Sequence, residues 1–386
     1  LVLTHILSIE DCIDAVDVET ICILVGMMLL VAVIKNSGIF EYIAIKAAKI
    51  AKGRPWPIMV IFIFITAVCS GMLDNVTTVL LVGPMTLAIT NILKVDPVPY
   101  IITQIMASNI GGTATLIGDP PNIMIGSAAK LSFVDFILNT GVATVFVIIV
   151  GLICMYFIYG RKLFVTDESI AKVMQLDENK AIKDRKLMHE SVIVIILVAL
   201  CFIFHDQLGV QSCTVAIAAA CIMLLIGGQE PEEIIADVEW PTILFFIGLF
   251  IVVGGMKKVG VITMLANGLI SITHGNMVVT MMVILWVSAI VSSFLDNIPF
   301  VATLIPMILT MQSEGMDVTP IWWALSLGAC LGGNGTLIGA SANVVLSGIS
   351  KNNGHPITFG QYFKIGFPMM ILSIIVCSVF LLIRFA

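Results

Sequence analysis

Charged residues are scarce in this sequence. Asp, Glu, Lys and Arg make up 11% of its 386 residues, whereas apolar residues make up 59%. Ordinary soluble domains carry about 25% charged and roughly 45–50% apolar residues. A water-soluble fold could not bury this much apolar surface, and long apolar runs such as 57–73 and 241–256 recur along the chain. The sequence therefore predicts an all-α polytopic membrane protein whose solvent is the lipid bilayer.

Several functional signatures are missing as well. The net charge is −6 and no basic stripe lies outside the loops, so we expect no nucleic-acid partner. The nine cysteines are scattered, without a CxxC pair or a His/Cys cluster, which argues against a disulfide framework or a zinc site. No HExxH, GK[ST] or Ser/His/Asp pattern is present. We therefore expect neither an enzyme nor a cofactor, and no ion other than a sodium ion or a proton.

The chain does contain an internal repeat. Three blocks of the first half return in the second half at nearly the same spacing, which makes chance similarity a poor explanation and indicates a tandem duplication. The LDN triplet and the GG…TLIG pattern are the most similar parts. The matched blocks are 24–38 with 246–260, 70–84 with 292–306, and 111–122 with 332–343.

The basic residues suggest how the two halves are oriented. Lys and Arg cluster at 35–54 and at 161–190, and the positive-inside rule places both clusters in the cytoplasm. An even number of crossings must separate them. A re-entrant hairpin, a broken helix that crosses outward over 98–130 and a helix that crosses back over 134–159 provide this number. The alternative is a full span in place of each hairpin. Equivalent blocks then face opposite ways, as in the inverted repeats of secondary transporters. The predicted units are a first repeat over 1–160 (hairpin 56–93, broken helix 98–130), a cytoplasmic linker over 161–190, and a second repeat over 191–386 (hairpin 275–313, broken helix 319–350).

Two further expectations concern the ends of the repeats. The second half has two helices, over 191–228, before its repeat core, whereas the first half begins almost at the core. We expect two transmembrane helices to precede residue 1 or to have been lost. Residues 38–52 have apolar residues at helical spacing with lysines opposite, which predicts an amphipathic helix at the cytoplasmic surface.

Four helix breaks carry the candidate chemistry, namely the LDN tips at 73–75 and 295–297 and the Gly-rich segments at 111–118 and 332–339. Backbone outside a helix at membrane depth is tolerated where it is buried in protein or lines a cavity. Carboxylates near the bilayer midplane are functional candidates by default, and oxygen ligands suit a hard cation. We predict two sodium-type coupling-ion sites. The first contains Asp74, Asn75, Thr113 and Thr115, and the second contains Asp296, Asn297, Asn334 and Thr336.

Other interpretations of these residues remain open. Asp and Asn at the tips are also strong helix N-caps, and capping can coexist with ion binding. Asp119 has Ala340 as its counterpart, so it is either a proton carrier or a substrate-selecting group, or the cap of the helix that resumes at Pro120. Asn122 and Asn343 are expected to close each break by bonding freed backbone or substrate. The predicted substrate-binding residues are Asn109, Gly111, Gly112, Asn122, Gly332, Gly333 and Asn343.

From these motifs, and above all from 108–126 and 331–345, the chain resembles the ion-transporter superfamily in its ArsB/NhaD and melanosomal P-protein branch. More distant relatives are the divalent-anion/sodium symporters and the citrate transporters. The resemblance implies a homodimer whose protomers each hold a scaffold domain and a transport domain that moves like an elevator. The symporters carry Ser-Asn-Thr signatures at the tips, and this chain has LDN instead.

Two functions are compatible with the sequence. The first is a secondary active transporter of an anion or small solute, of the arsenite or organic-anion class, coupled to sodium or protons. The second is a sodium/proton antiporter that uses the hairpin-tip aspartates. Either would be an integral multi-pass protein, with a prokaryotic plasma (inner) membrane as its expected location.

Overall fold

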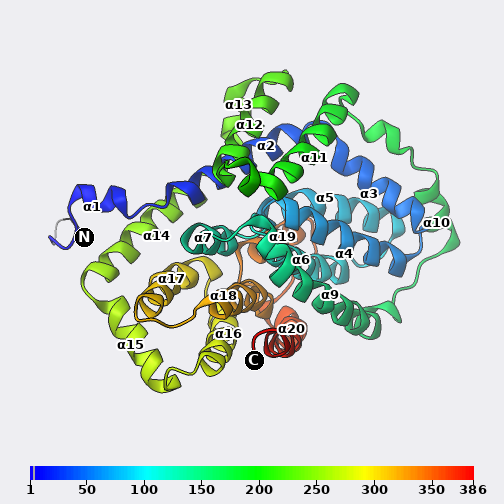
Figure 1. Cartoon of the computed structure of the whole chain (residues 1–386). Coiled ribbons are helices and arrows are strands. Elements are labelled where there is room, and N and C mark those ends of the chain that lie inside the picture. Colours follow the sequence, from blue (N-terminus) through cyan, green and yellow to red (C-terminus); the bar gives the residue numbers. More distant parts are fainter. Residues whose placement is uncertain (3–4) are drawn as a thin grey trace.

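The computed structural model describes residues 1–2 and 5–386, and within these residues it contains helices and no strand (Figure 1). The predicted all-α class is therefore confirmed. Eight helices among the described residues are long and apolar enough to cross a membrane. The first half, before the linker, consists of α1 (Ile9–Asp14), α2 (Val18–Lys35), α3 (Ile39–Ile50), α4 (Pro55–Met72), α5 (Asn75–Leu93), α6 (Val98–Thr113), α7 (Pro120–Ala129), α8 (Phe133–Phe136), η1 (Ile137–Gly141), α9 (Val142–Met155) and η2 (Tyr156–Gly160).

The second half repeats this order after two additional helices, α11 and α12. Between the halves lie α10 (Asp167–Met174) and the short turn η3 (Glu178–Ala181). The second half consists of α11 (Arg185–Leu208), α12 (Ser212–Ile226), α13 (Pro231–Ala236), α14 (Trp240–Lys258), α15 (Val261–Thr273), α16 (Met277–Phe294), α17 (Asn297–Ser313), α18 (Thr319–Gly332), η4 (Gly333–Gly335), α19 (Ser341–Asn352) and α20 (Phe359–Phe385).

Local sequence explains where these helices begin. Proline occupies the first turn of α4, α6, α7, α14 and α18, where its missing N–H costs nothing and its fixed φ suits a helix. Asp17 caps α2 by accepting from Thr20 N (3.2 Å), and Asn276 caps α16 by accepting from Val279 N (3.0 Å). The helices of the predicted hairpins and broken helices begin and end close to the predicted bounds. Whether each helix pair is a re-entrant hairpin or two full spans stays a prediction, because α4, α5 and α16 are each long and apolar enough to cross a membrane.

The repeat is visible in the packing as well as in the sequence. α4 packs on α6 in the first half, and α16 packs on α18 in the second. One hydrogen bond is conserved in this pairing, because Ser70 Oγ donates to Ser108 O and Ser292 Oγ donates to Ala329 O, both at 2.6 Å. The halves also exchange partners, since α7 packs on α17 and α19 packs on α5 (Figure 1). Each hairpin therefore packs against the resumed helix of the other half.

Ion pairs at the ends of α2 and α14 also join one half of the chain to the other. Lys35 at the end of α2 pairs with Asp237 after α13 (2.7 Å), and Lys258 at the end of α14 pairs with Asp11 in α1 (2.5 Å). Each long helix thus ends beside the short helix of the opposite half. The hydrogen bond from Lys258, with smaller help from Ser8, lowers the pKa of Asp11 from 3.8 to about 2.

The Asp11 pair gives a testable pH dependence. Because the folded-state pKa is depressed, its contribution to stability is present above pH 3.8 and is lost as pH falls toward 2. Lys258→Gln is expected to raise the pKa of Asp11 toward 3.8, because the largest cause of its lowering is removed while the two hydrogen bonds from Ser8 remain. Carboxyl NMR titration of the labelled protein follows this change. The control Lys257→Gln, one residue away, is expected to leave that titration unchanged. An unmoved Asp11 titration in Lys258→Gln would contradict the pairing.

The predicted amphipathic helix over 38–52 is present as α3, with Phe40, Ala44 and Ala48 buried on one face. The linker after η2 packs against it. Lys49 on α3 pairs with Glu178 of η3 (2.5 Å), and Lys183 N donates to Ser37 O (3.0 Å). α3 is therefore held between the first hairpin and the linker.

Candidate functional site between the hairpin tips

The hairpin tips are two short interruptions, at Leu73–Asp74 and at Leu295–Asp296. Asp74 accepts from both the backbone N and the hydroxyl of Thr77, and so caps α5. Asp296 accepts from Ile298 N (3.1 Å) and caps α17. The capping interpretation of both aspartates is therefore confirmed, and their role in ion binding stays a prediction.

The partners of the two capping aspartates differ between the halves. Asp74 is bound by Thr77 of its own hairpin, whereas Asp296 also accepts from the Ser341 hydroxyl of the second broken helix (2.8 Å). The equivalent of Ser341 in the first half is Pro120, which has no hydroxyl to offer. The two tips are thus related by the repeat but are not chemically identical.

Asp119 lies at the point where the two tips meet. Its carboxylate accepts from Asn75 Nδ2 at 3.2 Å and from Asn297 Nδ2 at 3.4 Å, so one residue of each hairpin tip binds the same acidic group. Asp119 is completely buried, and Asn75 and Asn297 are 4% and 2% exposed. Asp119 occupies the N-cap position of α7, with proline at the first helical position as predicted, but its side chain makes no cap bond, so the carboxylate itself does not cap the resumed helix.

The physical reason for this correction is the local backbone. Asp119 is extended (φ −144°, ψ 133°), and Pro120 and Pro121 follow it at the first two positions of α7. The two prolines have no N–H to be capped, and the Asn122 N–H that follows donates to the backbone oxygen of Asp119 (2.9 Å), so the Asp119 carboxylate is left to point toward the tips. Ala340, its counterpart, has nearly the same backbone angles (φ −152°, ψ 147°) and no polar side chain. The site therefore has one central carboxylate, supplied by the first half.

Asn122 and Asn343 bridge the breaks in the two crossing helices. Both residues are fully buried, and each points its side-chain amide N–H groups at carbonyls that the interruption leaves outside the helical ladder. This confirms that they satisfy freed backbone, as the sequence predicts, and binding of substrate stays a prediction. The acceptors of Asn122 are Gly112 O (3.3 Å), Thr113 O (3.2 Å) and Thr115 O (2.9 Å), and those of Asn343 are Gly333 O (2.7 Å) and Thr336 O (2.9 Å).

The side-chain oxygens of the same two asparagines connect the halves. Asn109 Nδ2 donates to Asn343 Oδ1 (2.9 Å), and the Cys330 thiol donates to Asn122 Oδ1 (3.5 Å). Cys330 is the counterpart of Asn109 in the repeat, and Asn122 is the counterpart of Asn343. The same contact therefore occurs twice, once from the first half to the second and once from the second half to the first. Ser326 strengthens the second contact by donating to Asn122 Oδ1 (2.6 Å). The two breaks therefore form one buried polar network.

The remaining predicted residues mostly bind backbone. Asn334 Oδ1 accepts from Asn109 Nδ2 (2.9 Å). The threonine hydroxyls donate to carbonyls, which leaves an oxygen lone pair for other partners. These bonds run from Thr113 to Asn109 O (2.6 Å), from Thr115 to Gly71 O (2.5 Å) and from Thr336 to Ser293 O (2.5 Å).

The four predicted glycines lie where helices touch. A Cβ on Gly111 would meet Ala67 O at 2.1 Å, and a Cβ on Gly332 would meet Ala289 O at 2.7 Å. On Gly112 and Gly333 it would meet the carbonyls of Gly118 and Gly339, at 2.6 Å and 3.2 Å. These glycines therefore allow each broken helix to approach its hairpin and to fold back on itself. Their part in binding substrate stays a prediction.

A small pocket lies beside the hairpin tips. Three carboxylates line it, those of Asp74, Asp119 and Glu239, and none of its lining residues is basic. Its water-accessible volume of about 20 Å³ is room for one water molecule or one small ion, which needs roughly 10–15 Å³. No group of three or more His, Cys, Asp or Glu among the described residues is placed to hold a metal. The pocket is therefore acidic and small, and binding of a coupling ion in it stays a prediction.

Sequence reasoning missed Glu239 and Ser326, whereas Cys330 is visible in the sequence directly before the second Gly-rich segment. Glu239 accepts from the Thr242 hydroxyl (3.3 Å) at the start of α14, as Asp17 accepts from the Thr20 hydroxyl (2.7 Å) at the start of α2. This repeated acid–threonine pair was a readable signal for Glu239. Ser326 lies in an apolar run with no motif, so no signal of this kind marked it.

Known proteins resemble this chain over nearly its whole length. A family model described as citrate transporter matches residues 1–328. An uncharacterized transporter of Mycobacterium tuberculosis is 42% identical over 374 residues, which cover 96% of this chain and 87% of the relative. The P protein of Homo sapiens is 32% identical over 456 residues, covering 97% of this chain and 54% of the relative. The crystal structure of the Alcanivorax borkumensis YdaH transporter matches with a TM-score of 0.56 at 16% identity, over 93% of this chain and 83% of that chain, and so shares the fold.

Proposed function

This chain belongs to the citrate transporter family and is an integral multi-pass membrane transporter, and we propose that it is a secondary active transporter whose coupling cation binds at Asp119. The observation that carries the proposal is the position of Asp119, a fully buried carboxylate that receives one asparagine from each hairpin tip. An ionisable group inside the membrane is costly and is a functional group by default.

The hydrogen bonds suggest how a cation would be coupled to movement. A proton or a sodium ion on Asp119 would compete with Asn75 and Asn297 for the same two carboxylate oxygens. Binding of the cation would therefore release the tips from the carboxylate, and loss of the cation would draw them together again. Differential affinity of this kind is what allows a ligand to shift a conformational equilibrium.

We propose a small anion or oxyanion-like solute as the transported species, of the organic-anion or arsenite class, with citrate as the first candidate because of the family. The acidic pocket would repel a free anion, so the solute would enter only with a compensating cation. Its water-accessible volume of about 20 Å³ is too small for such a solute, so the tips would have to separate to admit it. This links solute binding to the same movement as cation binding.

A sodium/proton antiporter is the second candidate. The specific observation in its favour is the pocket itself, which has three carboxylates, no basic lining residue and room for one small ion. In this version Asp119 carries the two ions in turn, with Asp74 and Asp296 at the tips as the predicted coupling residues.

The remaining features of the proposal follow from the inverted repeat. The two halves would exchange roles in alternating access, with hairpins and broken helices moving as one transport unit against α2 and α14. We also propose that the protein acts as a homodimer. A bacterial plasma membrane is the proposed location, because the relatives at 42% identity come from mycobacteria.

The test uses the full chain in proteoliposomes that contain a pH-sensitive dye. Uptake of labelled citrate that requires an inward sodium or proton gradient is the expected result. Sodium-driven proton movement without any organic solute would favour the antiporter instead. The double variant Asp74→Asn/Asp296→Asn is expected to lose the cation dependence, and an unchanged dependence would exclude the tip aspartates as coupling residues. Neither uptake nor ion exchange in any gradient would contradict both candidates.

A further inference from the structure

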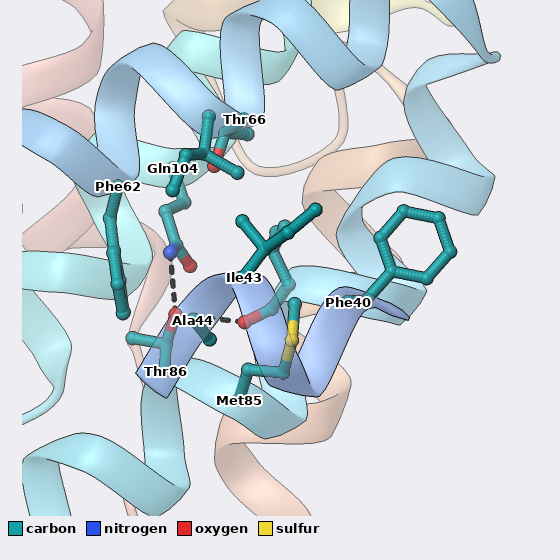
Figure 2. Close-up of a pocket in the computed structure, with 10 residues that line it drawn as sticks. Phe40, Ile43, Ala44, Phe62, Thr66, Met85, Thr86 and Gln104 are labelled. Carbon is teal, nitrogen blue, oxygen red and sulfur yellow. Dashed lines mark hydrogen bonds between the residues drawn. The ribbon is translucent and has the colours of Figure 1, made fainter. Parts of the chain in front are cut away.

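A second, smaller pocket lies away from the hairpin tips, between α3, α4, α5 and α6 (Figure 2). Phe40 and Ile43 of α3 and Phe62 of α4 supply much of its apolar wall, and Met85 of α5 adds to it. Figure 2 shows the polar side chains of Thr66, Gln104 and Thr86 together on one side, with Phe40 and Met85 on the other. The water-accessible volume is about 10 Å³. The pocket is therefore mostly apolar, with one polar side.

Two oxygen atoms on the polar side have no hydrogen-bond partner among the described residues. They are Thr66 Oγ1 and Gln104 Oε1, and the two residues are 0% and 1% exposed. Buried polar atoms are nearly always paired with protein or with ordered water. Two unpaired oxygens that line one cavity therefore point to a shared partner inside it.

Thr86 fixes which atom of Gln104 is left unpaired. Gln104 Nε2 donates to Thr86 Oγ1 (2.5 Å), and Thr86 Oγ1 donates in turn to Val82 O (2.8 Å). Because the Thr86 hydroxyl donates its one proton to Val82 O, its oxygen can only accept from the Gln104 side chain, and the group that faces it must be the amide N–H. The carbonyl end of Gln104 is then the end that needs a donor.

The repeat supplies an internal control for this cluster. The positions equivalent to Thr66, Thr86 and Gln104 in the second half are Ser288, Ile308 and Leu325. The same helix packing is thus achieved there with two apolar side chains. Packing alone therefore does not require Gln104 and Thr86. The polar cluster of the first half can bind a polar ligand that the equivalent apolar positions of the second half cannot bind.

We propose that this pocket binds one water molecule, which donates to Gln104 Oε1 and hydrogen-bonds with Thr66 Oγ1. A buried water needs two to four polar partners and a volume of roughly 10–15 Å³, and the pocket supplies both. A sodium ion is a poorer fit, because the three side-chain oxygens include no carboxylate and the rest of the wall is apolar. The water joins α4 to α6 beneath α3, and so stiffens the first hairpin and its broken helix as one unit.

A double-mutant cycle on the full chain tests the proposal. Thr66 and Gln104 share no direct hydrogen bond, so energetic coupling between them would pass through the water. Thr66→Val and Gln104→Leu are each expected to lower the melting temperature in detergent. The double variant should melt close to the more damaged single variant, because the first substitution already displaces the water. Strictly additive shifts would contradict a shared ligand.

Two controls complete the test. Ser288→Ala removes the equivalent unpaired hydroxyl of the second half, where no glutamine is present, and combined with Gln104→Leu it is expected to be additive. Melting of the wild type and of Gln104→Leu is then compared in sodium and in choline buffers. If sodium raises the melting temperature of the wild type but not that of Gln104→Leu, the ligand of the pocket is a sodium ion and not a water molecule, and the proposal is overturned. In a high-resolution map, a density peak within hydrogen-bond distance of both oxygens is expected, and an empty pocket would count against it.

Discussion

Asp119→Asn is expected to abolish cation-coupled transport while the protein still inserts and folds. The substitution keeps the shape of the side chain but removes the charge that both hairpin tips contact through Asn75 and Asn297. Interactions with a charged partner are worth about 1.5–3 kcal/mol, which corresponds to roughly a 10- to 150-fold loss of cation affinity. An amide also cannot take up a proton in the physiological range, so proton coupling would be lost completely.

The measurement separates coupling from binding. Uptake driven by a sodium or pH gradient is compared with solute exchange at equal cation concentrations, both in proteoliposomes. Asp119→Asn should lose the gradient-driven uptake, whether or not exchange survives. Glu232→Gln is the matched control, because it removes an exposed carboxylate in α13, far from the tips in sequence and outside the pocket. Wild-type gradient dependence in Asp119→Asn would refute the proposed coupling role.

Gly111→Ala is expected to prevent correct folding. The added Cβ would lie 2.1 Å from Ala67 O and 2.5 Å from Ala67 Cα, and these are backbone atoms that no rotamer change can move. α4 and α6 would have to separate along the surface that joins the hairpin to the broken helix. Overpacking of this kind costs about 1–3 kcal/mol or more, which is a large part of the stability of most proteins. Gly332→Ala, with a nearest contact of 2.7 Å, should have the same effect to a smaller degree.

The control for this prediction is Gly248→Ala in α14, where the added Cβ would meet nothing within 4 Å. Alanine is the better helix former by about 1 kcal/mol, so this variant should fold as well as the wild type or better. The folded fraction is measured by size-exclusion chromatography of detergent extracts, followed by thermal melting of the monodisperse peak. Equal yield and melting temperature for Gly111→Ala and Gly248→Ala would show that the close approach of α4 and α6 is not needed.

The linear pattern of residues determined most of the architecture. Scarce charge and long apolar runs specify helices in a bilayer, because only regular hydrogen bonding satisfies backbone there. The repeated LDN and GG…TLIG motifs located the four breaks between helices, since Gly, Asn, Asp and Pro act on the backbone within a few residues of their own position. The capping role of Asp74 and Asp296 was readable for the same reason.

Only the tertiary structure decided which of these residues meet. The sequence left Asp119 open between a helix cap and a titrating or selecting group, and the fold placed its carboxylate against Asn75 and Asn297 from opposite halves. It also joined Asn109 to Asn343 and Cys330 to Asn122, and brought Glu239 beside Asp74 in one pocket. These contacts depend on how α7 packs on α17 and α19 on α5. Such packing is set by the sum of many weak apolar contacts along whole helices, which no short motif encodes.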